Sequence, residues 1–140
     1  MTNAEALEYL REHQPMPSDA VVTAAQADRF IEVLQLLEAY PSEQAIPLLV
    51  GSVSETTGLG MYEHIGFVLR KLPVEQVAQH LIPLLEHPMP EVRGRAAWWC
   101  SDCPCPLLAM PLMRQLRQEQ NEEVRYALKG ALQACGTSGL

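Results

Sequence analysis

The stretch that decides the fold is residues 81–100, which read LIPLLEHPMPEVRGRAAWWC, and it returns in related form at residues 109–132, AMPLMRQLRQEQNEEVRYALKGAL. In both, an apolar string with proline at its third position leads into a turn and then into a Val-Arg pair. Apolar residues then recur at helical spacing, at Val92, Ala96, Trp99 and Cys100 and again at Val124, Leu128, Ala131, Leu132 and Cys135. This spacing predicts two helices, each with one buried stripe.

A third, looser copy lies upstream, at residues 45–72. It begins with Ala45-Ile46-Pro47-Leu48-Leu49 and carries Met61-Tyr62 where the later copies carry Val-Arg. The second helices begin at Met61, Val92 and Val124, which are 31 and 32 residues apart. A self-similar period of about 20 to 50 residues is typical of stacked-repeat proteins. We therefore expect a single domain over 1–140, with helical repeats at 43–72, 74–101 and 105–135 and N-terminal cap helices at 1–41.

Capping signals mark several helix ends. Thr2 and Glu5 have the spacing of a capping box, which predicts a helix from Thr2. Ser18 or Asp19 is expected to cap the next helix, which would run to about Tyr40. Asn121 is expected to cap the last helix.

A helix with an internal proline, a short turn, Val-Arg, and alanine four residues after the valine resembles the HEAT repeat. Residues 81–100 and 109–132 carry this resemblance. It implies an all-α fold, a right-handed α-solenoid of about three HEAT-like helical hairpins. HEAT proteins are mostly scaffolds and partner-binding modules. A minority are bilin lyases or isomerases, a few are DNA glycosylases, and small bacterial members include immunity proteins that neutralise a toxin.

The distribution of charge indicates which classes of partner the protein could bind. The net charge is −7, with ten acids and two bases in residues 1–63 and seven acids and eight bases in 64–140. Nucleic-acid binders need a basic face, so the balance disfavours nucleic acid and favours a protein with a basic surface. No apolar run approaches the roughly 20 residues that cross a bilayer. The start, MTNAEALEYLREH, carries acids where a signal peptide needs a basic and then an apolar segment. We expect a cytoplasmic protein without a membrane partner.

Motifs for catalysis or cofactor binding are weak. Cys100, Cys103 and Cys105 form C-x2-C-x-C, and thiolates at such spacing can hold zinc, with Cys135 as a fourth ligand. The alternative, which we prefer, is that Cys100 and Cys135 lie on core stripes as small apolar residues. The sequence has no Gly-rich phosphate loop and no nucleophile elbow. We predict no enzyme activity, no metal and no cofactor.

Residues beside the buried stripes are candidates for a partner-binding groove on the second helices. Aromatic residues and arginine dominate binding energy at interfaces. The candidates are Tyr62, Phe67, Arg70, Arg93, Arg95, Trp98, Arg125 and Tyr126. Two alternatives stay open: in HEAT-like repeats the arginine after valine often pairs with an acid of the neighbouring repeat, and Tyr62 and Phe67 could be buried by the next repeat. Trp98 and Trp99 are about 100° apart on a helix, so Trp99 is assigned to the core and Trp98 to the groove.

The expected function is that of a non-catalytic protein-binding module, more specifically an immunity-type inhibitor. The alternatives are a small-molecule HEAT enzyme of the bilin lyase kind and a DNA-repair glycosylase-like protein. Self-association through an apolar end of the stack is a further expectation.

Overall fold

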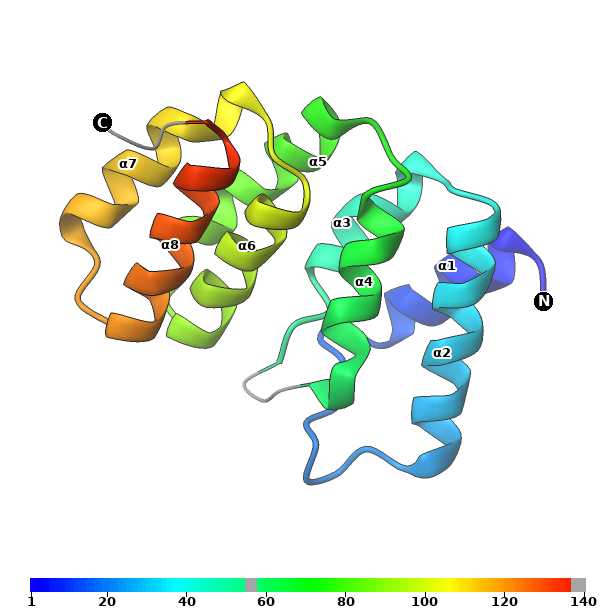
Figure 1. Cartoon of the computed structure of the whole chain (residues 1–140). Coiled ribbons are helices and arrows are strands. Elements are labelled where there is room, and N and C mark those ends of the chain that lie inside the picture. Colours follow the sequence, from blue (N-terminus) through cyan, green and yellow to red (C-terminus); the bar gives the residue numbers. More distant parts are fainter. Residues whose placement is uncertain (55–57, 137–140) are drawn as a thin grey trace. The chain divides into compact units, whose positions relative to one another are not determined.

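The computed structural model describes residues 1–54 and 58–136, and these residues form helices and no strand, which confirms the all-α prediction. Figure 1 follows the helices along the chain. The chain divides into two compact units, Met1–Leu72 and Pro73–Leu140. Within the described residues, none of the helices has both the length and the apolar character that crossing a bilayer demands.

Unit 1 is built around the pairing of α2 with α1 and α4. Its elements are α1 (Asn3–Glu12), α2 (Ala24–Ala39), the 3-10 helix η1 (Glu43–Ala45), α3 (Ile46–Val50), the 3-10 helix η2 (Gly58–Gly60) and α4 (Met61–Leu69). Side chains with no exposed surface fill its centre, among them Leu10, Phe30, Leu34, Leu37, Ile46 and Leu49.

The first two helices both begin with capping boxes. Thr2 Oγ1 accepts from the amide of Glu5 at 3.1 Å, and Glu5 Oε1 accepts from the amide of Thr2 at 3.2 Å, as predicted. The predicted cap of α2 is wrong. Thr23, paired with Gln26, is the N-cap, while the Ser18 carbonyl accepts two amides of a preceding turn. The capping box at Thr23 satisfies two amides together, which a lone serine at position 18 does not.

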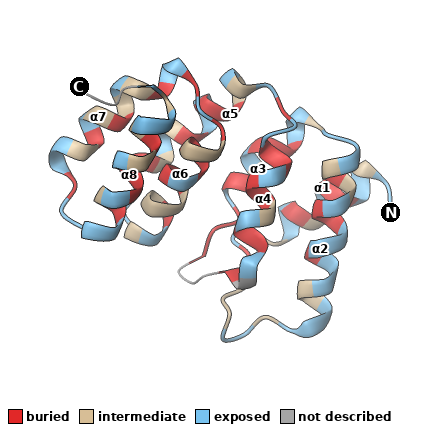
Figure 2. Cartoon of the chain, viewed as in Figure 1, coloured by how far each residue is buried: buried red, intermediate tan, exposed pale blue. Residues whose placement is uncertain are grey.

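Unit 2 is built around α6 and α8, which lie side by side and begin at the same edge (Figure 1). Its elements are α5 (Val74–Leu81), the 3-10 helix η3 (Ile82–Glu86), α6 (Pro90–Asp102), the 3-10 helix η4 (Pro106–Leu108), α7 (Ala109–Gln118) and α8 (Glu122–Ala134). In Figure 2 the buried residues recur at helical spacing along these helices, with exposed residues between them.

The buried stripes of the second helices follow the predicted pattern. On α4 and just beyond it, Met61, Ile65, Val68, Leu69 and Leu72 are buried. On α6 and α8 the buried positions include Val92, Ala96, Trp99, Cys100, Val124, Leu128 and Ala131, whereas Leu132 and Cys135 are only half-buried.

The matched prolines lie at helix starts rather than in helix interiors. Pro47 and Pro111 fall in the first turns of α3 and α7, and Pro83 is the second residue of η3, where the α-helical part of the segment has ended. Proline has no amide hydrogen, and first-turn amides have no partner within the helix, so these positions accept it at little cost.

Candidate functional site

The two adjacent tryptophans of α6 point in different directions. Trp99 has no exposed surface, whereas Trp98 is 44 % exposed. Successive residues on a helix are rotated by about 100°, so only one of them can join the core. The burial confirms Trp99 as the core residue and leaves Trp98 on the surface.

Trp98 meets a second exposed aromatic side chain, Tyr126 of α8. Their ring centroids lie 6.1 Å apart with the planes tilted by 56°. Tyr126 is 71 % exposed, although α6 and α8 are packed against each other along their length. Arg95 lies one turn before Trp98, is half-buried, and interacts with other residues. Three of the eight candidate residues therefore belong to one exposed face of unit 2, which we call the α6–α8 face.

Two more candidates lie together on α4, in unit 1. Phe67 is half exposed, and the guanidinium carbon of Arg70 lies 5.3 Å from the centroid of its ring. This distance suits a cation–π contact. Phe67 and Arg70 therefore form an exposed pair on α4.

Tyr62 does not belong to a binding surface, which corrects one of the predicted sites. It is only 1 % exposed, and its hydroxyl accepts from the amide of Ser54 at 2.7 Å and contacts Ser54 Oγ at 3.0 Å. A Cβ at Gly58 would lie 2.7 Å from the Tyr62 ring, so only glycine fits there, and its φ of +72° favours glycine as well. Tyr62 is a core residue that bonds Ser54 and packs beside Gly58.

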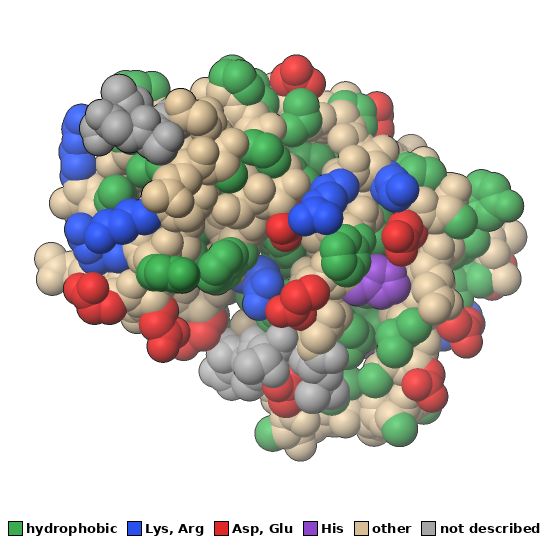
Figure 3. All heavy atoms as spheres, in the orientation of Figure 1, with side chains coloured by type: hydrophobic (Ala, Val, Ile, Leu, Met, Phe, Trp, Pro, Cys, Tyr) green, Lys and Arg blue, Asp and Glu red, His purple; other side chains and the backbone are tan. Residues whose placement is uncertain are grey.

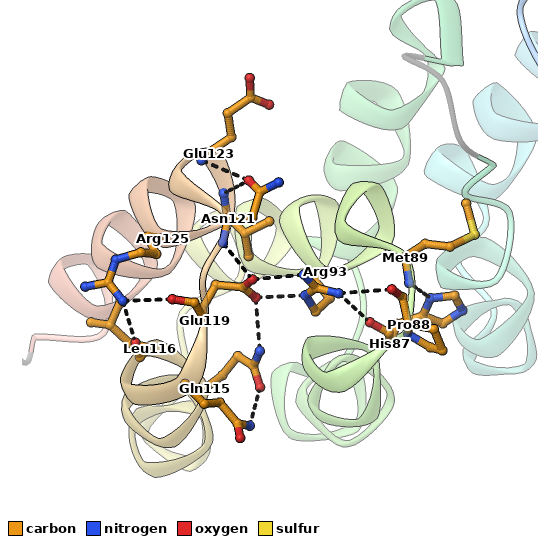
Figure 4. A network of polar contacts seen from close by, with 12 residues as sticks. His87, Pro88, Met89, Arg93, Gln115, Leu116, Glu119, Asn121, Glu123 and Arg125 are labelled. Atoms are coloured by element: carbon orange, nitrogen blue, oxygen red, sulfur yellow. Dashed lines mark hydrogen bonds and ion pairs between the residues drawn. The ribbon is translucent and has the colours of Figure 1, made fainter.

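Arg93 lies inside a polar network (Figure 4). Its Nε and Nη2 donate to the two carboxylate oxygens of Glu119 at 2.8 and 2.9 Å, and its Nη1 donates to the carbonyls of His87 and Pro88. The side chains are 17 % and 2 % exposed, respectively. This confirms the alternative in which the arginine pairs with an acid further along the chain, and it gives Arg93 a structural role.

Glu119 receives two further hydrogen bonds, from Gln115 Nε2 at 3.0 Å and from the amide of Asn121 at 3.2 Å. The hydrogen bonds from Arg93 lower the pKa of Glu119 to about 2, against the opposing effect of burial. They also raise the pKa of Arg93. The carboxylate is therefore ionised and fully bonded, so it serves stability rather than proton transfer.

Arg125 plays the matching role in the last hairpin. Its Nη1 donates to the carbonyls of Leu116 and Glu119 at 2.8 and 3.0 Å, where α7 ends. Arg93 bonds a carbonyl six residues before it, at His87, and Arg125 does the same at Glu119. Both arginines thus bind the free carbonyls that follow the first helix of a hairpin. Arg125 therefore has a structural role as well, and its side chain is half-buried.

An open hollow of about 290 Å³ lies beside this network. It is lined by Glu86, His87, Pro88, Arg93, Gln115, Gln118, Glu119 and Gln120. Among the described residues, no buried side-chain nitrogen or oxygen lacks a hydrogen-bond partner. The described side chains of the network therefore have no buried donor or acceptor that a ligand would be needed to satisfy.

Sequence reasoning missed Glu119 and Gln115. The offset of 32 residues that relates Arg93 to Arg125 also relates His87 to Glu119, so it marks the Glu119 carbonyl that Arg125 binds and gives no signal for the Glu119 carboxylate or for Gln115.

The cysteines are mainly packing residues. Cys100, Cys103 and Cys105 are buried thiols, and Cys135 is half-buried. Burial raises the pKa of the Cys100 thiol, with smaller contributions from Cys135 and Cys103. In the described part of the chain, no three His, Cys, Asp or Glu side chains are placed to hold one metal ion.

The chain was compared with protein-family models, with curated proteins and with solved structures, and no match was found in any of the three comparisons.

Proposed function

We propose that this chain is a non-catalytic protein-binding module and that the α6–α8 face contacts the partner. The observation that carries the proposal is the pair of neighbouring exposed rings, Trp98 and Tyr126. Large aromatic side chains are enriched among the residues that dominate binding energy, and they are favourable contacts because few rotatable bonds become fixed. Burial of these rings by a partner would release the water that they now order.

The equivalence of Arg93 and Arg125 supports a finer proposal about the fold. The two residues are 32 apart and bond carbonyls at the same sequence offset, which supports the proposal that residues 74–101 and 105–135 are two copies of one hairpin. We infer that these hairpins are HEAT-like and that the chain is a short right-handed α-solenoid. The resemblance to HEAT repeats implies that the arginine after valine pairs with an acid beyond its own hairpin, as Arg93 does with Glu119.

Charge supports a partner with a basic surface. Unit 1 holds ten acids and four bases, a sum of −6, whereas unit 2 holds seven acids and six bases, a sum of −1. An acidic protein is drawn to basic partners by long-range attraction, which raises the rate of encounter. The finer proposal is that the chain inhibits such a partner in the cytoplasm, in the manner of an immunity protein.

Site-specific photo-crosslinking in the native cell tests the proposal. A photoreactive phenylalanine analogue placed at Trp98 is expected to yield one dominant protein adduct. The same analogue at Tyr40, an aromatic residue of unit 1 that is 66 % exposed, is the matched control and is expected not to yield it. The purified partner should then lose affinity for a Trp98→Ala/Tyr126→Ala variant whose thermal unfolding is close to that of the wild type. Equal adducts from positions 98 and 40, or unchanged affinity of the double variant, would contradict the proposal.

A further inference from the structure

Four residues on the α6–α8 face form a pattern that the capping and core contacts leave unexplained. They are Gly94 and Trp98 on α6, with Tyr126 and Gly130 on α8. Arg93 and Arg125 are equivalent residues that lie 32 positions apart in the sequence. By the same spacing, Gly94 is equivalent to Tyr126, and Trp98 is equivalent to Gly130. Each aromatic residue therefore has a glycine at the equivalent position of the neighbouring helix.

Helix packing does not require these glycines. A Cβ at Gly94 would have Val124 Cγ2 at 3.7 Å as its contact, and a Cβ at Gly130 would have Ser101 Oγ at 3.9 Å. Both distances are ordinary van der Waals contacts, and no other described neighbour comes within 4 Å. Glycine inside a helix is less stable than alanine because it loses more conformational freedom. Its presence at both positions leaves bare helix backbone beside the two rings.

Carboxylates lie at the edge of the same face where both helices begin. Glu91 and Glu123 are also 32 residues apart and therefore equivalent. Both are exposed, Glu91 in the first turn of α6 and Glu123 in the first turn of α8. Glu122 and Glu123 lie one helical turn before Tyr126. None of the three forms an ion pair with a described residue. In Figure 3 acidic side chains gather along this edge, next to hydrophobic side chains over α6 and α8.

Acids in a first turn also stabilise the helix dipole, which accounts for glutamates at these positions in general. That effect does not account for exposed rings one and two turns further along. Nor does it account for glycines at the two positions where a larger residue would fit.

We infer that the α6–α8 face binds a segment of the partner through a cationic side chain, arginine in the first place, that stacks on Trp98 and Tyr126 and faces Glu91 and Glu123. The inference rests on the proposed function and names the chemistry of its partner. A guanidinium is planar, so it stacks on an aromatic face while its N–H groups pair with carboxylates. The bare backbone at Gly94 and Gly130 lets the main chain of the segment approach closely. Unit 2 sums to only −1 and Arg95 lies on the same face, so the attraction for this ligand comes from the first-turn carboxylates themselves.

Peptide titration with the whole chain tests the inference. The probe is a short glycine/serine peptide that carries arginine at several positions. Matched peptides carry citrulline, which keeps the shape of arginine without its charge, or glutamate. The chain has two tryptophans, so the indole N–H signals in a proton–nitrogen correlation spectrum report each one, and Trp98→Phe assigns them. We expect the Trp98 signal to move and the signal of buried Trp99 to stay.

The arginine peptide is expected to bind about tenfold more tightly than the citrulline peptide, a ratio that corresponds to about 1.4 kcal/mol. The difference should shrink at high salt, because exposed charges are screened. Glu91→Gln/Glu123→Gln should reduce the preference for arginine, whereas Glu32→Gln on α2 should not. Gly94→Ala/Gly130→Ala should raise the melting temperature and weaken binding of the peptide.

Equal affinity for the arginine and citrulline peptides would overturn the inference, as would a preference for glutamate. Either result is distinguishable from failure of the proposed function, because a partner crosslinked at position 98 would still establish the face as a protein contact. Unchanged peptide affinity in the Gly94→Ala/Gly130→Ala variant would overturn the role of the glycines.

Discussion

The Arg93–Glu119 pair provides the sharpest prediction about stability. Its two hydrogen bonds, at 2.8 and 2.9 Å, connect α6 to the segment between α7 and α8. The Glu119 side chain is only 2 % exposed, so solvent replaces a lost bond poorly. Glu119→Gln removes the negative charge and keeps the size and one acceptor oxygen. We expect this change to destabilise the folded state because Arg93 then lacks its counter-charge in a buried site.

The magnitude follows from the pKa of Glu119. The hydrogen bonds that Glu119 accepts, first those from Arg93 and then those from Gln115 and Asn121, lower that pKa from 4.5 to about 2 despite burial. One pKa unit corresponds to about 1.4 kcal/mol, so ionised Glu119 contributes about 3 kcal/mol to the free energy of unfolding at neutral pH. Because the folded-state pKa is the lower one, this contribution is present above about pH 5 and is lost as the pH falls toward 2. Arg93→Met should cost about 3–5 kcal/mol, because it leaves a buried carboxylate without its cation.

Urea unfolding of the wild type and Glu119→Gln, followed by circular dichroism from neutral to acidic pH, measures this contribution. The free-energy difference between them should fall from about 3 kcal/mol at about pH 7 to about half that at about pH 3. Other carboxylates titrate equally in both proteins, so the difference isolates Glu119. The control is Glu32→Gln, which breaks an exposed ion pair on α2 and should change stability by less than about 0.5 kcal/mol. A difference between wild type and Glu119→Gln that stays constant with pH, or a cost below about 1 kcal/mol at about pH 7, would refute the reasoning.

Three further predictions concern residues outside this network. Tyr62→Phe should lower the free energy of unfolding in urea by about 1–3 kcal/mol, because the buried amide of Ser54 loses its acceptor. No change would show that water replaces the hydroxyl. Thr23→Ala should cost about 1 kcal/mol whereas Ser18→Ala should cost less, since only the threonine side chain caps α2; the reverse order would restore the earlier cap assignment. Iodoacetamide should modify Cys135 of the native protein well before Cys100, as followed by mass spectrometry. The reason is that burial shields the Cys100 thiol and raises its pKa. Equal rates of modification would contradict the described burial.

Several features follow from the sequence alone. The spacing of Val92, Ala96 and Trp99 fixes one buried stripe because helical periodicity depends only on residues close in the chain. The same reasoning separates Trp99 from Trp98 without any tertiary information. Capping at Thr2 is local too, since the residues involved are three apart. The all-α class is the sum of such local signals.

The predicted groove was less reliable because its members depend on neighbours distant in the chain. Arg93 and Arg125 look like surface arginines by position. Arg93 is drawn into a network by Glu119, 26 residues away, and by carbonyls that α-helix geometry leaves free. Helical spacing places residues on a face of their own helix and does not identify what covers that face.

The sequence by itself determined the helices, their buried stripes and the repeat of about 32 residues. Only the tertiary structure decided which residues beside those stripes stay exposed. It buries Tyr62 against Ser54 and Gly58, binds both arginines to carbonyls at helix ends, and leaves Trp98 and Tyr126 exposed as a pair. The physical reason is that a stripe is set by rotation along one helix, whereas exposure is set by the packing of neighbouring helices and the polar groups at their ends.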